Sequence, residues 1–163
     1  MERRTPLLKH LKIVSGGQTG ADQAALNWAI KHGLPHGGWC PKGRWAEDGI
    51  IDERYSLTET PGSDPAQRTE WNIRDSDATV IFSTRPELIG GSRLTAELAQ
   101  KLGKSWLWLA RDREGHESAK KLADFIVAHR ITVLNVAGPR ASEESETQQF
   151  VQQVLLYALS AKH

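Results

Sequence analysis

Two adjacent glycines after a short β-branched strand are the first sign of binding chemistry in this chain. Residues 13–22 read Ile-Val-Ser-Gly-Gly-Gln-Thr-Gly-Ala-Asp, so a glycine turn joins the strand to a helix that we expect to begin near Ala21. Glycine lets the backbone turn sharply and brings bare N–H groups close to a ligand. The helix adds its unpaired N–H groups and the positive end of its dipole. This arrangement is typical of a cradle for an anion, most often phosphate.

The predicted ligand contacts in this first loop are Gly16, Gly17, Gln18, Thr19, Gly20 and Asp22. Asp22 lies one residue inside the helix, where it either contacts the ligand or only caps the helix. An alternative interpretation of the whole loop is a tight β–α turn that binds nothing. The loop matches neither common nucleotide motif, because the glycines do not fit Gly-x-Gly-x-x-Gly and no Gly-Lys-Ser/Thr follows. A generic dinucleotide-binding or ATPase function is therefore poorly supported.

A second glycine pair follows the apolar run at residues 78–83 and again precedes an expected helix. Hydroxyls in the first turn of that helix can add side-chain donors. Helix capping explains the serine alone, but it explains the glycine pair less well. We expect the two glycine bends to converge on one sheet edge, where they would suit a ligand with an extended anionic group. The predicted contacts from this second loop are Ser83, Thr84, Gly90, Gly91, Ser92 and Thr95.

A third loop should reach the same edge with two cations and an aromatic ring. Lys42 and Arg44, on either side of Gly43, can pair with phosphate oxygens, although an isolated surface cation is more often only solvated. Trp39 offers a flat face for a ring, so the predicted contacts from this third loop are Trp39, Lys42 and Gly43. Cys40 is a candidate ligand for a soft metal, but a single thiol is more often a small buried hydrophobe.

Catalytic residues are harder to identify. The polar run from Arg68 to Asp77 is more typical of a structural network of ion pairs and helix caps. The alternative is that Asp75 from this run, or Glu97 further along the chain, acts as a carboxylate base in glycosidic chemistry. The six histidines show no paired spacing for a metal, and no serine-centred nucleophile elbow is present. Nothing in the sequence compels an enzymatic interpretation.

Composition excludes several classes of protein. The formal net charge of +1 gives no bulk attraction to nucleic acid or to an anionic membrane, and no apolar run approaches the length of a bilayer span. The basic start of the chain lacks the apolar core of a signal peptide. A single cysteine cannot form an internal disulfide, which fits a reducing compartment. We therefore expect a cytoplasmic protein with no nucleic-acid or membrane partner.

The elements that must position these loops alternate between strand and helix. The expected strands are residues 11–15, 78–83, 105–110 and 131–137, with short strands near 38–40 and 55–58. The expected helices are 21–32, 66–76, a helix with Leu94, Leu98 and Leu102 on one face, 118–129, and a last helix capped by Ser142 with an acidic first turn of Glu143, Glu144 and Glu146.

This alternation predicts a Rossmann-like α/β fold, an open and mostly parallel sheet with helices on both faces. We expect one domain over residues 1–163, with a flexible N-terminus at residues 1–10. Ligands of such sheets bind beyond the C-terminal ends of the strands, where the glycine loops lie. The irregular segment 35–65 should be ordered, because Trp39, Trp45, Ile50, Ile51, Tyr55 and Leu57 are scattered through it.

Four blocks together resemble the molybdenum cofactor carrier proteins, a circularly permuted branch of the Rossmann-like superfamily of cytokinin-activating phosphoribohydrolases, once mislabelled lysine decarboxylases. The blocks are Ser-Gly-Gly-Gln-Thr-Gly-Ala-Asp at 15–22, Gly-Trp-Cys-Pro-Lys-Gly-Arg at 38–44 with Ala-Glu-Asp-Gly at 46–49, Arg-Asp-Ser-Asp-Ala-Thr at 74–79, and Leu-Asn-Val-Ala-Gly-Pro-Arg at 134–140. They extend over most of the chain and are too long and ordered to arise from the fold alone.

The resemblance implies a non-enzymatic role: holding the molybdenum cofactor and passing it to apo-molybdoenzymes. This cofactor is a pterin (molybdopterin) with a terminal phosphate and dithiolene-bound oxomolybdenum. The glycine cradles would suit its anionic groups, and the pterin would stack on an aromatic face or bond to the backbone. By position in the shared blocks, the resemblance adds Asn135, Gly138 and Arg140 to the predicted contacts, and it implies a homo-oligomer.

One departure from the related hydrolases matters. Their Pro-Gly-Gly-x-Gly-Thr-x-x-Glu corresponds here to Ile-Gly-Gly-Ser-Arg-Leu-Thr-Ala-Glu at 89–97, which keeps the glycine pair and Glu97 but loses the proline, the third glycine and the threonine. Arg93 replaces that third glycine where the ribose phosphate would lie. The alternative functions are therefore a nucleoside-monophosphate phosphoribohydrolase that uses Glu97, a nucleotide-binding sensor, or an anion-binding scaffold for another ligand.

Overall fold

Five parallel strands form the central sheet, in the order β2–β1–β9–β7–β8. The computed structural model describes residues 10–111 and 116–159. The strands are β1 (Lys12–Val14), β2 (His36–Gly37), β7 (Ala78–Ser83), β8 (Ser105–Ala110) and β9 (Val133–Ala137). The expected single α/β domain of Rossmann-like type is confirmed, while most of the predicted flexible N-terminus lies outside the described residues.

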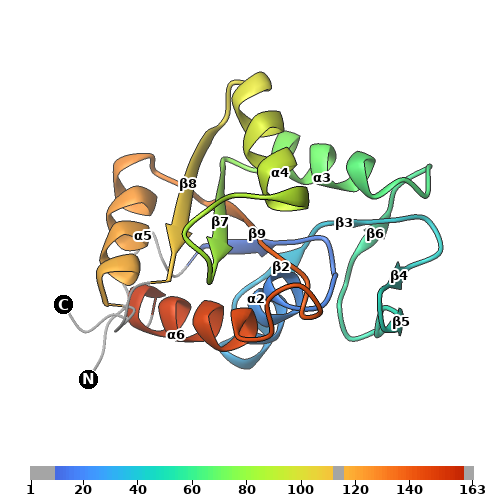
Figure 1. Cartoon of the computed structure of the whole chain (residues 1–163), viewed down its shortest axis with the longest axis horizontal. Coiled ribbons are helices and arrows are strands. Elements are labelled where there is room, and N and C mark those ends of the chain that lie inside the picture. Colours follow the sequence, from blue (N-terminus) through green and yellow to red (C-terminus); the bar gives the residue numbers. More distant parts are fainter. Residues whose placement is uncertain (1–9, 112–115, 160–163) are drawn as a thin grey trace.

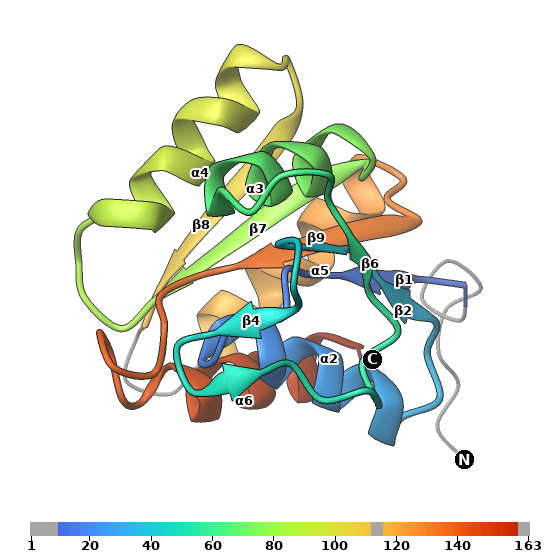
Figure 2. The ribbon, with the colours of Figure 1, turned by 90° about the vertical axis from the view of Figure 1, so that its right-hand side faces the viewer.

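Helices cover both faces of the sheet. On one face lie α3 (Pro65–Arg74) and α4 (Gly90–Lys101), and on the other α2 (Ala21–Lys31), α5 (His116–Ala128) and α6 (Thr147–Leu159) (Figures 1 and 2). The helix α3 begins where its sequence dictates, because the Asp64 carboxylate accepts from the Ala66 N–H at 2.9 Å and Pro65 takes the first helical position. None of the helices in these described ranges is long and apolar enough to cross a membrane.

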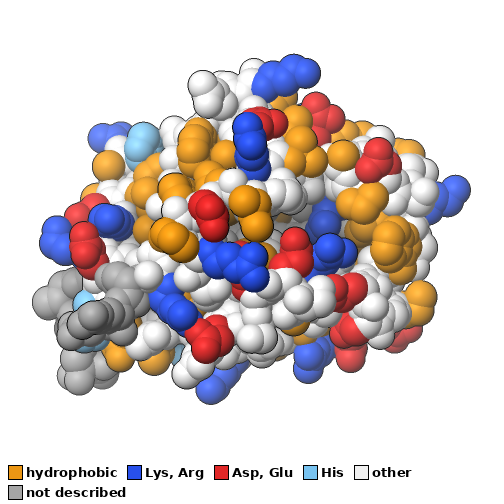
Figure 3. Space-filling view, viewed as in Figure 1, with side chains coloured by type: hydrophobic (Ala, Val, Ile, Leu, Met, Phe, Trp, Pro, Cys, Tyr) orange, Lys and Arg blue, Asp and Glu red, His pale blue; other side chains and the backbone are white. Residues whose placement is uncertain are grey.

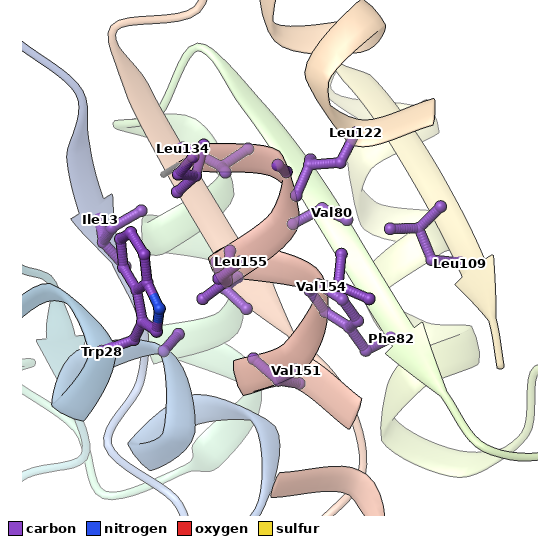
Figure 4. Close-up of a cluster of buried hydrophobic side chains, with 14 of the residues drawn as sticks. Ile13, Trp28, Val80, Phe82, Leu109, Leu122, Leu134, Val151, Val154 and Leu155 are labelled. Atoms are coloured by element: carbon purple, nitrogen blue, oxygen red, sulfur yellow. The ribbon is translucent and has the colours of Figure 1, made fainter. Parts of the chain in front are cut away.

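The main core lies between the sheet and α2, α5 and α6. Ile13 and Leu134 pair in register on β1 and β9, and both contribute to this core (Figure 4). Phe82 meets Phe150 of α6 edge to face, with ring centroids 5.5 Å apart. β7 is buried along its whole length, as the near-continuous apolar run at 78–83 predicts for a strand covered on both faces.

On the opposite face, α4 packs through its small residues. Ser92, Thr95, Ala96 and Ala99 are buried, whereas Leu94 and Leu102 remain 39% and 36% exposed. Two residues of the apolar stripe predicted for this helix thus face solvent in the single chain, and Leu98 between them is partly buried.

The segment between β2 and α3 is ordered, as its aromatic residues predicted. It contains a parallel pair, β3 (Trp39–Cys40) with β6 (Thr58–Glu59), and a hairpin of β4 (Trp45–Ala46) and β5 (Gly49–Ile50). A second small core closes under it, formed by Leu26, Cys40, Ala46, Ile51 and Tyr55.

The predicted start of the last helix is wrong. α6 begins at Thr147, and residues 141–146 form a turn instead of a capped acidic first turn. The polar side chains of this turn bond to other loops: the Ser142 hydroxyl donates to Glu47, and Glu144 accepts from Thr84. Tertiary hydrogen bonds therefore outweigh the local capping signal.

Candidate functional site

A cavity of about 240 Å³ lies at the C-terminal ends of β1 and β9, beside the N-terminus of α4. The sheet order explains its place. The β1–α2–β2 unit runs outward in one direction and the β7–α4–β8 unit in the other, with β9 between them. Ligands of open α/β sheets bind at such a switch in direction, because the loops there diverge and leave a crevice.

Half of the predicted contact residues line this cavity. It brings together both glycine bends, as expected, along with the loop after β9: Gly16, Gln18, Asp22, Gly91, Ser92, Thr95, Asn135, Gly138 and Arg140. The other predicted contacts do not line it: Gly17, Thr19, Gly20, Trp39, Lys42, Gly43, Ser83, Thr84 and Gly90.

The first glycine loop satisfies several of its own donors. The Gln18 N–H donates to the Asp22 carboxylate at 3.2 Å, and the Thr19 N–H donates to the Gln18 side chain at 3.0 Å. The loop also touches the one after β9: the Ala21 N–H donates to the Pro139 carbonyl, and at Gly20, where φ is 78°, any side chain would collide with that carbonyl. Part of the donor set of this loop is thus used within the protein, and the loop is held close to the one after β9.

The N-terminus of α4 is more open to a ligand than the first glycine loop. Its N-cap residue Ile89 is extended and gives no side-chain cap, so the first N–H groups of this 12-residue helix receive no carboxylate or hydroxyl from that position. Gly91 and Ser92 present this first turn to the cavity. The dipole of α4 therefore favours negative charge here.

Arg68 of α3 supplies a cation that the sequence analysis did not select. Its Nη1 donates to the Asp22 Oδ2 at 3.1 Å, and the guanidinium lies over Gly16, where a Cβ atom would overlap it. Burial raises the pKa of the Asp22 carboxyl above its ordinary value, and the Arg68 charge opposes that rise. Residues Pro65, Thr69 and Asn72 line the cavity beside Arg68, so they share one face of α3, but no signal in the sequence shows that this face meets the strand ends.

Arg140 and Glu47 close the cavity rim. The Arg140 guanidinium bonds to Glu143 at 3.1 Å, and it lies 3.9 Å from Glu47. Glu47 also accepts from the hydroxyls of Thr19 and Ser142, and these two hydrogen bonds lower the pKa of its carboxyl. The β4–β5 hairpin, which carries Glu47, is thereby fastened to the loops after β1 and β9.

The aromatic residue at the cavity is Trp45, not Trp39. Trp45 lies on β4, lines the cavity and is 44% exposed. Trp39 instead donates its indole N–H to Asp75 at 2.8 Å and packs edge to face on Trp71. The Trp39 indole, which we expected to offer its face to a ligand ring, therefore makes its contacts within the protein.

The cations predicted on the third loop are placed differently from Arg68 and Arg140. Arg44 points inward and donates to backbone carbonyls of residues 51, 52, 55 and 57, so its role is to hold this segment together. Lys42 is exposed. The Gly43 N–H donates to the Glu59 carboxylate at 2.6 Å.

Neither candidate carboxylate base lies in the cavity. Glu97 points outward from α4, where its 61% exposed side chain pairs with Arg93. Asp75 pairs with Arg74 and Trp39. The C-terminal part of the polar run therefore has the structural role expected of it, with Asp77 accepting three hydrogen bonds from Thr132 and Val133, whereas Arg68, Thr69 and Asn72 of the same run line the cavity.

No cluster of metal ligands is found in the part of the chain that the structure describes. Within it, no three His, Cys, Asp or Glu side chains gather to hold a metal ion, and Cys40 is buried. Figure 3 shows acidic and basic side chains interspersed on the face it displays. Selectivity for an anion must therefore come from local donors, not from a broad field.

Comparison with known proteins shows the family of the chain. The chain matches the model of the circularly permutated YpsA SLOG family over residues 13–159. It is 48% identical to a protein of solved structure named "Putative molybdenum carrier protein" from Syntrophus aciditrophicus, with a TM-score of 0.88 over 91% of this chain and 94% of that one. No curated protein matches. The resemblance carried by the four sequence blocks is confirmed, and the chain belongs to the circularly permutated YpsA SLOG family.

Proposed function

We propose that this protein binds the molybdenum cofactor without converting it and carries it to apo-molybdoenzymes. One observation carries the proposal: the uncapped N-terminus of α4, Arg68 and Arg140 meet at a single cavity at the switch point of the sheet. Helix N–H groups and two guanidinium groups are the donors that a phosphate prefers. The name of the Syntrophus protein supports the choice of a molybdenum-containing ligand.

The donor set fits the organic part of this ligand better than its metal. Phosphate oxygens would take the N–H groups of Gly91 and Ser92, with Arg68 alongside. No cluster of metal ligands is available among the described side chains, and the thiol of Cys40 is buried. Molybdenum would thus keep its dithiolene bonds to the pterin, and the protein would hold the cofactor by its phosphate and its ring.

Trp45 is suited to protect such a ligand. Its indole stands at the cavity rim on a two-strand hairpin that hydrogen bonds between Glu47 and the residues Gln18, Thr19 and Ser142 fasten to the loops opposite. A carrier must shield the dithiolene from oxygen and still release it. The hairpin meets both needs if it closes over the ligand and opens for transfer.

The test is to isolate the protein from cells that make the cofactor and to identify bound pterin by fluorescence and mass spectrometry. We expect pterin at close to one per chain, and its transfer should activate an added apo-molybdoenzyme. Arg68→Ala should lose most of the bound pterin, and Lys42→Ala should retain it. Absence of bound pterin, together with no protection of added cofactor against air, would overturn the proposal.

The phosphoribohydrolase alternative gains no support from the position of Glu97, which points away from the cavity. It predicts release of free base from nucleoside monophosphates and loss of that release in Glu97→Gln. We expect no release from either protein, measured by chromatography over a panel of nucleotides.

The predicted homo-oligomer has a suitable surface on α4. Ile89, Leu94 and Leu102 are each more than a third exposed, and burying such side chains in a subunit contact would be favourable. Light scattering should therefore report an oligomer, and Leu94→Glu should dissociate it.

A further inference from the structure

A second cavity of about 260 Å³ adjoins the first at the N-terminus of α4. The two cavities share Ser92, Pro139 and Glu143, so a ligand seated at the start of α4 can extend into both. The second cavity is also lined by Glu144, from the turn before α6, by Ser83 at the end of β7, and by Arg85, Glu87 and Ile89 from the loop before α4. The Arg85 guanidinium donates to the Glu143 carbonyl at 3.2 Å, so three glutamates and one arginine line this cavity.

Glu144 is a buried carboxylate with only half of its acceptor capacity used. It is 7% exposed, and its Oε1 accepts both the N–H and the hydroxyl of Thr84, each at 2.6 Å. Its Oε2 accepts no hydrogen bond from the described residues, and no described cation forms an ion pair with it. The other buried carboxylate beside these cavities, Asp22, does have a cationic partner in Arg68.

A buried carboxylate without a cation is costly unless donors satisfy it. Each carboxylate oxygen has room for about two donors. Thr84 fills Oε1, so Oε2 can accept N–H groups from a molecule in the second cavity. A ligand that presents such donors would satisfy this oxygen.

The two cavities therefore differ in the charge they prefer. The first offers the N-terminus of α4 and Arg68 to an anion, and the second offers a carboxylate oxygen to N–H donors. We propose that Glu144 recognises the amino-substituted pyrimidinone ring of a phosphate-bearing ligand whose phosphate lies at Arg68. This inference rests on the proposed function, and it assigns the pterin ring to the second cavity.

The test compares two synthetic ligands that differ in one group. Phosphorylated 6-hydroxymethylpterin carries the 2-amino group, and its lumazine counterpart carries oxygen there. Calorimetry should show the lumazine binding about tenfold more weakly or worse, because a carbonyl would face Oε2 where a charge-assisted hydrogen bond is lost. Glu144→Gln should bind the pterin about tenfold more weakly and abolish the preference, because its amide presents N–H to the ligand's own donors.

Inorganic phosphate is the internal control. Its affinity should be equal in the native protein and Glu144→Gln, and Glu97→Gln should leave all three affinities unchanged. Equal binding of pterin and lumazine by the native protein would overturn the inference and leave the carrier function intact. Failure to bind either compound would overturn both. If Glu144→Gln does not fold, the comparison of the two ligands on the native protein decides the question.

Discussion

The guanidinium of Arg68 lies against the backbone of Gly16, in space that the Cβ atom of any other residue would occupy. From there its Nη1 reaches the buried carboxylate of Asp22 at 3.1 Å. The φ of Gly16 is not positive, so the absence of a side chain, and not an unusual backbone, is what this position requires. The first glycine of the loop thus makes room for a cation of the protein itself.

We predict that Gly16→Ala weakens phosphate binding about tenfold, because the new methyl group displaces Arg68 from the cavity and removes a charge-assisted hydrogen bond. Arg68→Ala should cause a similar loss. Since both substitutions act through the same guanidinium, adding Gly16→Ala to Arg68→Ala should cost no further affinity. Isothermal titration with inorganic phosphate measures all three proteins. Additive losses in the double variant would show that Gly16 acts on the ligand directly.

Trp45→Ala should shorten the lifetime of the bound cofactor. Removing the indole opens the cavity rim without touching the donors at α4, so release and air oxidation should become faster while the rate of binding changes little. Stopped-flow pterin fluorescence measures both rates. Trp39→Phe is the matched control, because its ring packs on Trp71 outside the cavity. Equal release rates in the native protein and Trp45→Ala would contradict this role.

Local sequence signals predicted the elements that depend on local chemistry. β7 occupies Ala78–Ser83, as its apolar run predicted, and α2 begins at Ala21 after the glycine turn. The predicted start of α6 is wrong because Ser142, the expected N-cap, bonds to Glu47, a residue 95 positions away. A capping pattern read along the chain cannot include such a partner.

The residues of the candidate site also fall into those that local sequence signals could locate and those that only the tertiary fold brings together. The glycine bends could be located because a glycine pair after a strand has few other uses. Arg68 and Trp45 could not, since their types are common on surfaces and only the tertiary fold brings α3 and the β4–β5 hairpin to the strand ends. Arg44 fits neither of the two roles considered for it, phosphate pairing or simple solvation, because the fold uses it on its own carbonyls.

Glu47 should make the hairpin sensitive to acid. Hydrogen bonds from Ser142 and Thr19 lower the pKa of its carboxyl below the ordinary 4.5, so folding favours the ionised form. The stabilisation is therefore complete above pH 4.5 and is lost as the pH falls through the lowered pKa. Hydrogen exchange at residues 45–50, corrected for the intrinsic rate, should accelerate in that range relative to β7.

Glu47→Gln removes the titrating group, so the hairpin of this variant should exchange faster at neutral pH and show no acid transition of its own. Asp48→Asn is the control, because the Asp48 side chain accepts no hydrogen bond from the described residues. An acid transition that persists in Glu47→Gln would assign the effect to another carboxylate.

Arg44 and Lys42 allow a direct comparison of a structural cation with a solvated one. The Arg44 guanidinium donates to four backbone carbonyls, those of residues 51, 52, 55 and 57, at 3.0 to 3.4 Å. Arg44→Ala leaves these carbonyls without a donor and should lower the free energy of unfolding by about 2–3 kcal/mol. Lys42→Ala, on an exposed side chain, should change it by less than about 0.5 kcal/mol. Urea titration of both variants measures the difference, and equal effects would mean that the carbonyls near Arg44 are satisfied by water as well as by the guanidinium.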